Sequence, residues 1–221
     1  MEKKKVLSVL RKESKNNLIQ IIDEVYGLLS EPDIFKIFTP YYEKSFSKKS
    51  FVGRTVGDIE QFYKDSYAGE YYAPFDVNSK NFMHIPEETE LWFDLLRDYL
   101  DKTVKLFEME EYKLAADCFS KLFNVYNDMD RDIVFADELG GHLLHAEHKQ
   151  IIPKFIRALA KTKDPQDYAK EILLLMRLDE YDYNMKKVYN FAKRIGSKEQ
   201  KEALKKQAQK NQYYRREIGK F

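Results

Sequence analysis

The sequence predicts an all-α protein built from antiparallel helix pairs, arranged as a short α-solenoid or an irregular helical bundle. Three observations support this fold class. Leu, Lys, Glu and Ala, which favour helices, are abundant in the 221-residue chain, whereas only 8 Gly and 6 Pro occur. Apolar residues recur in several segments at the three- and four-residue spacing of a helix face. Near the C-terminus, two predicted helices are joined by a tight turn, which is typical of a helical hairpin.

Residues 1–67 are predicted to form an N-terminal helical cap. A serine cap precedes an apolar helix face formed by Leu18, Ile21, Ile22, Val25, Leu28 and Leu29. Pro32 suits the first turn of a short second helix, which is expected to stop before Pro40. Thr55 and Asp58 have the spacing of a capping box, and they therefore predict that a third helix begins there.

Residues 68–86 lack helical periodicity and are predicted to form an aromatic loop. The segment is rich in rings, which distinguishes it from a disordered linker. Two interpretations follow: a loop that packs over the helices through its rings, or the aromatic wall of a partner-binding cleft. The second interpretation assigns partner binding to Tyr71, Tyr72, Phe75 and Phe82.

Residues 87–210 are predicted to form a region of helical hairpins. Apolar stripes predict a long helix from Glu87 and a second helix directly after it. A further helix is expected to begin at Pro153, and another is capped by Asp164 with Pro165 at its first position. Towards the C-terminal end, a helix stop and a capping box predict two helices joined by a tight turn, at Gly196, Ser197 and Gln200.

The segment that follows the predicted long helix resembles the second half of a tetratricopeptide repeat. In that family a tyrosine opens the second helix, a small residue follows three positions later, and an aromatic residue lies four positions beyond; here these are Tyr112, Ala115 and Phe119. The upstream helix, from Asp98 to Phe107, corresponds to the first helix of one repeat. The resemblance implies stacked helix pairs that offer a concave face to a protein or peptide partner. The whole chain is also similar to bacterial helical proteins without an assigned function, a likeness that implies no chemistry.

Composition and charge argue against several classes of protein. The chain has 38 Lys+Arg and 37 Asp+Glu, whereas chains built to bind the phosphate backbone usually carry a larger basic excess. The single cysteine, Cys118, provides neither a disulfide framework nor a thiolate zinc site within one chain. No apolar stretch approaches the roughly 18 residues of a membrane span, and the short apolar run near the start is too brief for a signal peptide. These features predict a cytoplasmic protein.

Three of the four histidines lie close together, beside acidic residues. On a continuous helix, four candidate metal ligands would share one face or lie one turn beyond it, namely Glu138, His142, His145 and His148. Imidazole and carboxylate groups so placed can hold Zn²⁺ or non-haem iron, as in a metal-dependent enzyme or a metal-binding protein. Two glycines interrupt this helix and Pro153 opposes its continuation, so histidines in a loop or at a helix edge are the alternative.

The C-terminal stretch is basic, because lysines and arginines outnumber glutamates between residues 197 and 221. Its last part, residues 211–221, is predicted to form a basic tail. A nucleic-acid accessory protein would use the rings of this tail to stack on bases and its guanidinium groups to neutralise phosphates, through Tyr213, Tyr214, Arg215 and Arg216. A solvated terminal helix with a frayed end accounts for the same residues without that function.

The sequence contains no nucleophile and base in a known catalytic arrangement, no phosphate-binding glycine loop and no dinucleotide-binding motif. The leading hypothesis is therefore a non-catalytic helical scaffold that needs no cofactor and binds a protein or peptide partner. The partner would lie in a groove between helix pairs, flanked by the aromatic loop. A metal-dependent enzyme or metal-binding protein is the first alternative, and a nucleic-acid accessory protein is the second.

Overall fold

The structure is a computed structural model that describes residues 6, 9–10, 12–45, 48–140, 148–177 and 185–218. All regular secondary structure in these residues is helical, which confirms the predicted all-α fold class. The chain divides into two compact units, which comprise residues 1–46 and residues 47–221.

The first unit contains α2 (Lys15–Tyr26) and α3 (Glu31–Ser45). Ser14 caps α2, because its hydroxyl accepts a hydrogen bond from the backbone N–H of Asn17 at 3.2 Å. The predicted first helix is therefore present, although it ends before Leu28. None of the side chains described in this unit is buried, so the apolar residues among them form no enclosed core.

Two helices continue through prolines at which the sequence predicts a boundary. The helix α3 passes Pro40, and α8 (His148–Thr162) contains Pro153 in its interior. A proline inside a helix removes one backbone hydrogen bond and costs about 3 kcal/mol. In α8 the cost is offset by apolar residues buried on both sides of the proline, namely Ile151, Ile152, Phe155 and Ile156. The boundaries predicted at these two prolines are wrong.

The second unit begins with α4 (Lys48–Ala68). Thr55 lies inside this helix, so the helix start predicted there is wrong. Its buried face recurs every three or four residues, through Phe51, Thr55, Ile59, Phe62 and Ser66. The helix continues through Gly53 and Gly57, whose low helix propensity hides the continuous helix in the sequence. Both glycines lie on the exposed side, where they interrupt no packing.

A helical hairpin follows, formed by α5 (Glu87–Glu108) and α6 (Tyr112–Asn127), and it confirms the two helices predicted there. The turn between them is short because Glu110 adopts a left-handed backbone conformation with φ of 65°. Of the motif that resembles a tetratricopeptide repeat, Ala115 and Phe119 are buried. Membership of that family stays a prediction.

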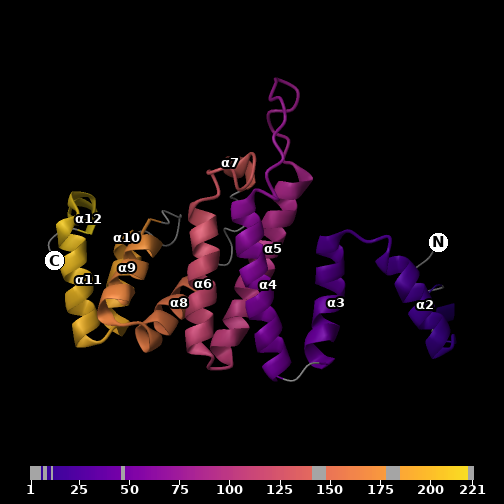
Figure 1. Ribbon diagram of the computed structural model, residues 1–221, viewed down its shortest axis with the longest axis horizontal. Helices are drawn as coiled ribbons and strands as arrows, with labels where there is room; N and C mark the ends of the chain where they lie inside the picture. Colours follow the sequence, from indigo (N-terminus) through magenta and orange to yellow (C-terminus); the bar gives the residue numbers. More distant parts are fainter. Residues whose placement is uncertain are drawn as a thin grey trace. The chain divides into compact units, whose positions relative to one another are not determined.

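Aromatic rings form much of the core of the second unit, in which α6 packs against α4, α5 and α8 (Figure 1). The rings of Phe62 and Trp92 lie 5.8 Å apart between centroids, and those of Phe123 and Phe155 stack at 5.4 Å. The indole N–H of Trp92 donates a hydrogen bond to the Ser66 hydroxyl at 2.9 Å. The one polar atom of this buried ring is therefore satisfied.

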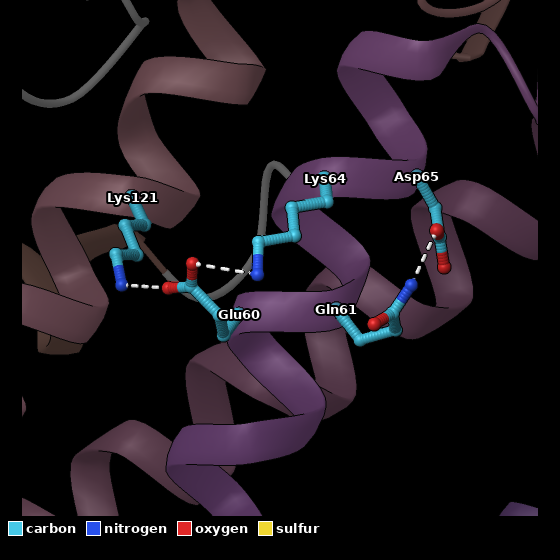
Figure 2. Close-up of polar contacts among 5 residues, drawn as sticks. All are labelled: Glu60, Gln61, Lys64, Asp65 and Lys121. Carbon is cyan, nitrogen blue, oxygen red and sulfur yellow. Dashed lines mark hydrogen bonds and ion pairs between the residues drawn. The ribbon is translucent and has the colours of Figure 1, made fainter.

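A polar contact joins α4 and α6 nearer the surface (Figure 2). The carboxylate of Glu60 accepts a hydrogen bond from Lys121, and its second oxygen lies 3.4 Å from the ammonium of Lys64. The hydrogen bond from Lys121 lowers the pKa of the Glu60 carboxyl below its ordinary value. Along α4, the Gln61 amide donates to Asp65 at 2.7 Å. Exposed pairs of this kind add little stability, so burial of the rings holds the helices together.

The second unit ends in four further helices, α9 (Pro165–Leu175), α10 (Met185–Ile195), α11 (Lys198–Lys210) and α12 (Gln212–Ile218). The Asp164 carboxylate caps α9, because it accepts hydrogen bonds from the backbone N–H groups of Gln166 and Asp167 at 2.8 and 3.0 Å. Ser197 and Gln200 form the predicted capping box at the start of α11. The predicted starts of both helices are confirmed.

Candidate functional site

The residues between α4 and α5 form a loop that projects beyond the ends of these helices (Figure 1). Three of the four predicted partner-binding rings lie at its base. Tyr71 packs against Phe62 of α4, with ring centroids 5.7 Å apart. The rings of Tyr72 and Phe75 lie 6.1 and 5.0 Å from that of Phe135. These contacts fasten the loop to the helices.

The segment that follows α6 supports this base. The Tyr67 hydroxyl of α4 donates a hydrogen bond to Asp128 at 2.9 Å, and burial together with this bond raises the pKa of Tyr67. The Thr89 hydroxyl of α5 donates to the backbone carbonyl of Phe135 at 2.7 Å. The segment that carries Phe135, on which the loop rests, is therefore held by hydrogen bonds as well as by packing.

Asparagine side chains order the outer end of the loop. The amide oxygen of Asn81 accepts a hydrogen bond from the backbone N–H of Asn78 at 2.7 Å, and that of Asn78 accepts one from the N–H of Lys80 at 2.9 Å. The side-chain amide of Asn81 also donates to the carbonyl of Asp76 at 2.9 Å. Such bonds are typical of asparagine-containing turns, and they fix the backbone without help from the helices.

Three apolar side chains flank this turn and remain exposed, with 60% of Val77, 61% of Phe82 and 65% of Met83 accessible to solvent. We call these three residues the loop tip. Phe82 is the fourth predicted partner-binding residue, whereas the sequence prediction omits the other two. The signal that could have located them is the polar turn sequence of residues 78–81, which places its apolar neighbours at the far end of the loop.

The structure describes two of the four predicted metal ligands. Glu138 lies exposed on the short helix α7 (Asp137–Gly140), and His148 begins α8. His142 and His145 lie outside the described residues. Among the residues that are described, no three His, Cys, Asp or Glu side chains come together as a metal site would require. The metal-binding hypothesis stays a prediction.

The predicted nucleic-acid residues lie on α12, where they differ in exposure. Tyr213, Arg215 and Arg216 are exposed. Tyr214 is only 4% exposed, and its hydroxyl donates a hydrogen bond to the backbone carbonyl of Leu173 at 2.9 Å. This ring anchors α12 to α9, so only one of the two tyrosines presents its face to solvent.

Cys118 is buried on α6, where the sequence places it close to the apolar stripe. Burial raises the pKa of its thiol to about 11. A cysteine acts as a nucleophile through its thiolate, which is scarce at neutral pH when the pKa is raised. The side chain therefore serves as a small apolar group in the core.

A polar cluster lies between α4 and α5. Lys102 is buried, and its ammonium lies 2.7 Å from a carboxylate oxygen of Asp98 and 5.2 Å from the centroid of the Tyr99 ring. Asp58 faces it from α4, where burial raises the pKa of the Asp58 carboxyl although Lys102 opposes the rise. The buried cation is thus neutralised by groups around it, which is what a structural ion pair requires.

No protein-family model, no curated protein and no solved structure matches the chain. In the part of the chain that the structure describes, no helix combines the length and the apolar character needed to cross a membrane.

Proposed function

We propose that the protein is a non-catalytic helical scaffold that binds a protein partner through the loop tip. The observation that carries the proposal is an ordered loop that holds Val77, Phe82 and Met83 in solvent. Fully burying an apolar side chain of this size stabilises a complex by about 1.5–3 kcal/mol. Exposed apolar groups that are gathered on one feature are typical of a surface that a partner covers.

The rigid base of the loop supports this proposal. A flexible loop loses conformational entropy when it binds, at about 0.5–1.5 kcal/mol for each side chain that becomes fixed. Here the rings at the base and the hydrogen bonds made by Asn78 and Asn81 already order the loop. Burial of the loop tip can therefore contribute to affinity with a smaller entropic loss. The helix pairing of a tetratricopeptide-like chain and a cytoplasmic location, where a free Cys118 stays reduced, are consistent with this role.

Photo-crosslinking tests the proposal directly. The photo-reactive analogue benzoylphenylalanine replaces Phe82 in the full chain, and the same analogue replaces the exposed Gln209 of α11 as a control. After irradiation in an extract of the source organism, we expect one defined protein to be linked to position 82 and not to position 209. Equal labelling from both positions would contradict a specific partner.

Binding of the captured partner to purified variants provides the second test. Phe82→Ser combined with Met83→Ser removes two apolar contacts and should weaken binding roughly 100-fold. Ser79→Ala, in the same turn, is the matched control and should bind like the wild type. Asn81→Ala keeps the apolar side chains but removes the hydrogen bond to Asp76, so it should weaken binding by disordering the loop. Unchanged affinity of the double variant would refute the proposal.

A further inference from the structure

A groove of about 520 Å³ lies at the C-terminal end of the second unit, between α9, α11 and the start of α12. Four exposed cations line it: Lys170 and Arg177 on the α9 side, and Lys206 and Lys210 on α11. Its volume falls within the roughly 300–1,000 Å³ typical of ligand pockets. It is separate from the loop tip and shares no residue with it.

The charge of the groove is one-sided. Among the described residues, no Asp or Glu lines it. Lys206 and Lys210 are also separated by four positions on one helix, where like charges repel each other. Elsewhere in the unit, cations of neighbouring helices face carboxylates, as in the pairs Lys154–Glu108 at 2.8 Å and Lys163–Asp117 at 2.6 Å. Within the described part of the chain, the lining of the groove therefore offers positive charge to an incoming anion.

The floor of the groove is apolar and fixed. Leu173 and Leu174 of α9 line it together with Tyr214, whose buried ring and hydrogen bond hold α12 in place. The amide of Gln207 on α11 donates to the side-chain oxygen of Gln166 on α9 at 3.0 Å, which joins the two helices across one part of the groove. The site thus combines a cationic rim with an apolar base before any ligand binds.

We infer that this groove binds an acidic peptide segment of a partner protein, with carboxylates on the cations and an apolar side chain over the leucines. A single strand of nucleic acid satisfies the charges, but it gains much of its affinity from aromatic rings on which bases stack. Among the described residues, Tyr214 is the one ring that lines the groove, and it is 4% exposed. The apolar floor, without an open ring face, favours a peptide.

Fluorescence anisotropy on the full chain tests this inference with defined probes. One probe is a fluorescein-labelled peptide of alternating glutamate and leucine, and the second is a labelled oligothymidylate of similar charge. We expect the peptide to bind saturably and more tightly than the oligonucleotide. A dissociation constant above about 1 mM for the peptide would overturn the inference. Tighter binding of the oligonucleotide than of the peptide would overturn it as well.

Two double variants distinguish binding in the groove from general electrostatic attraction to the protein. Lys206→Gln with Lys210→Gln removes two cations of the groove, and it should weaken peptide binding about tenfold. Lys198→Gln with Lys205→Gln removes two exposed cations of the same helix that do not line the groove, and it should leave binding unchanged. Equal losses in both pairs would overturn the inference. Circular dichroism melting checks that all variants fold, and the loop-tip variant Phe82→Ser with Met83→Ser should bind the peptide normally.

Discussion

Cys118 provides a direct chemical probe of the core, because the residue is 3% exposed and no other cysteine occurs in the chain. With a pKa of about 11, it is almost entirely protonated at pH 8. Iodoacetamide should therefore label the native protein at least about 100-fold more slowly than the protein unfolded in guanidinium. Mass spectrometry of timed samples measures both rates. Labelling of the native protein at the rate of the unfolded one would show that the thiol is accessible.

The same thiol makes stability depend on pH in a defined direction. Its folded pKa lies above the ordinary value of 9.0, so the folded state disfavours the thiolate. The contribution to stability is complete below pH 9 and is lost as the pH rises from 9 towards 11. Unfolding by urea should show this loss in the wild type, at about 2–3 kcal/mol. Cys118→Ala should lack this decrease in the free energy of unfolding between pH 9 and 11. The same pH dependence of stability in both proteins would contradict the raised pKa of the thiol.

Gln200 joins two helices through both ends of its side chain. Its oxygen accepts a hydrogen bond from the backbone N–H of Ser197, while its amide donates to the carbonyls of Ala160 and Lys163 at 3.2 and 2.9 Å. Gln200→Ala should lower the free energy of unfolding by about 2–3 kcal/mol, because it removes the side-chain half of the capping box and leaves two carbonyls without this donor. Gln209→Ala, an exposed change on the same helix, should have little effect. Similar urea midpoints for both variants would show that the contacts of Gln200 contribute little.

At the scale of helices, α4 carries two glycines that its packing does not require. A Cβ atom added at Gly53 or Gly57 would meet no heavy atom within 4 Å. Alanine at each position reduces the conformational entropy of the unfolded chain and favours the helix by about 0.5–1 kcal/mol. Gly53→Ala combined with Gly57→Ala should therefore raise the free energy of unfolding by about 1–2 kcal/mol, measured by urea denaturation.

Gly196, unlike Gly53 and Gly57, is closely surrounded by other atoms, and its substitution is the control for the α4 double variant. A Cβ atom there would lie 3.2 Å from the Tyr168 ring and 3.3 Å from both the Ala192 carbonyl and the Gln200 side chain. Gly196→Ala should accordingly destabilise the protein by about 1–3 kcal/mol. A lower free energy of unfolding for Gly53→Ala combined with Gly57→Ala would contradict the prediction for α4. It would show that the two glycines are needed for a bend or a contact that the structure does not contain.

The helices also show which boundaries the sequence can predict. The caps at Asp164 and Ser197 act through residues two or three positions away, and local spacing predicts both helix starts correctly. Pro153 lies inside a helix because the apolar residues around it are buried by other helices, and no local pattern contains that information. For the same reason, the start of α4 follows from the buried face that begins at Phe51 and not from the capping box.

At the scale of the whole molecule, the candidate site was only partly predictable. The loop and Phe82 follow from composition, since a ring-rich segment without periodicity is typical of an ordered loop. Tyr72 and Phe82 look alike in the sequence, yet one lies at the base and the other at the loop tip. The difference depends on Phe135, a distant residue whose ring meets Tyr72. Long-range contacts of this kind decide which rings remain available to a partner.

The two units should differ sharply in stability. Every side chain described as buried lies in residues 47–221, and none of the side chains described in the first unit is buried. Helices of moderate length are marginal in water unless an apolar face is buried. Hydrogen exchange followed by mass spectrometry should therefore show amides of α2 and α3 exchanging at least about 100-fold faster than those of α5 and α6. Deletion of residues 1–46 should leave the melting temperature within about 2 °C, because the buried core is retained. Slow exchange in α2, comparable to that in α6, would instead show that its exposed apolar residues are covered in solution.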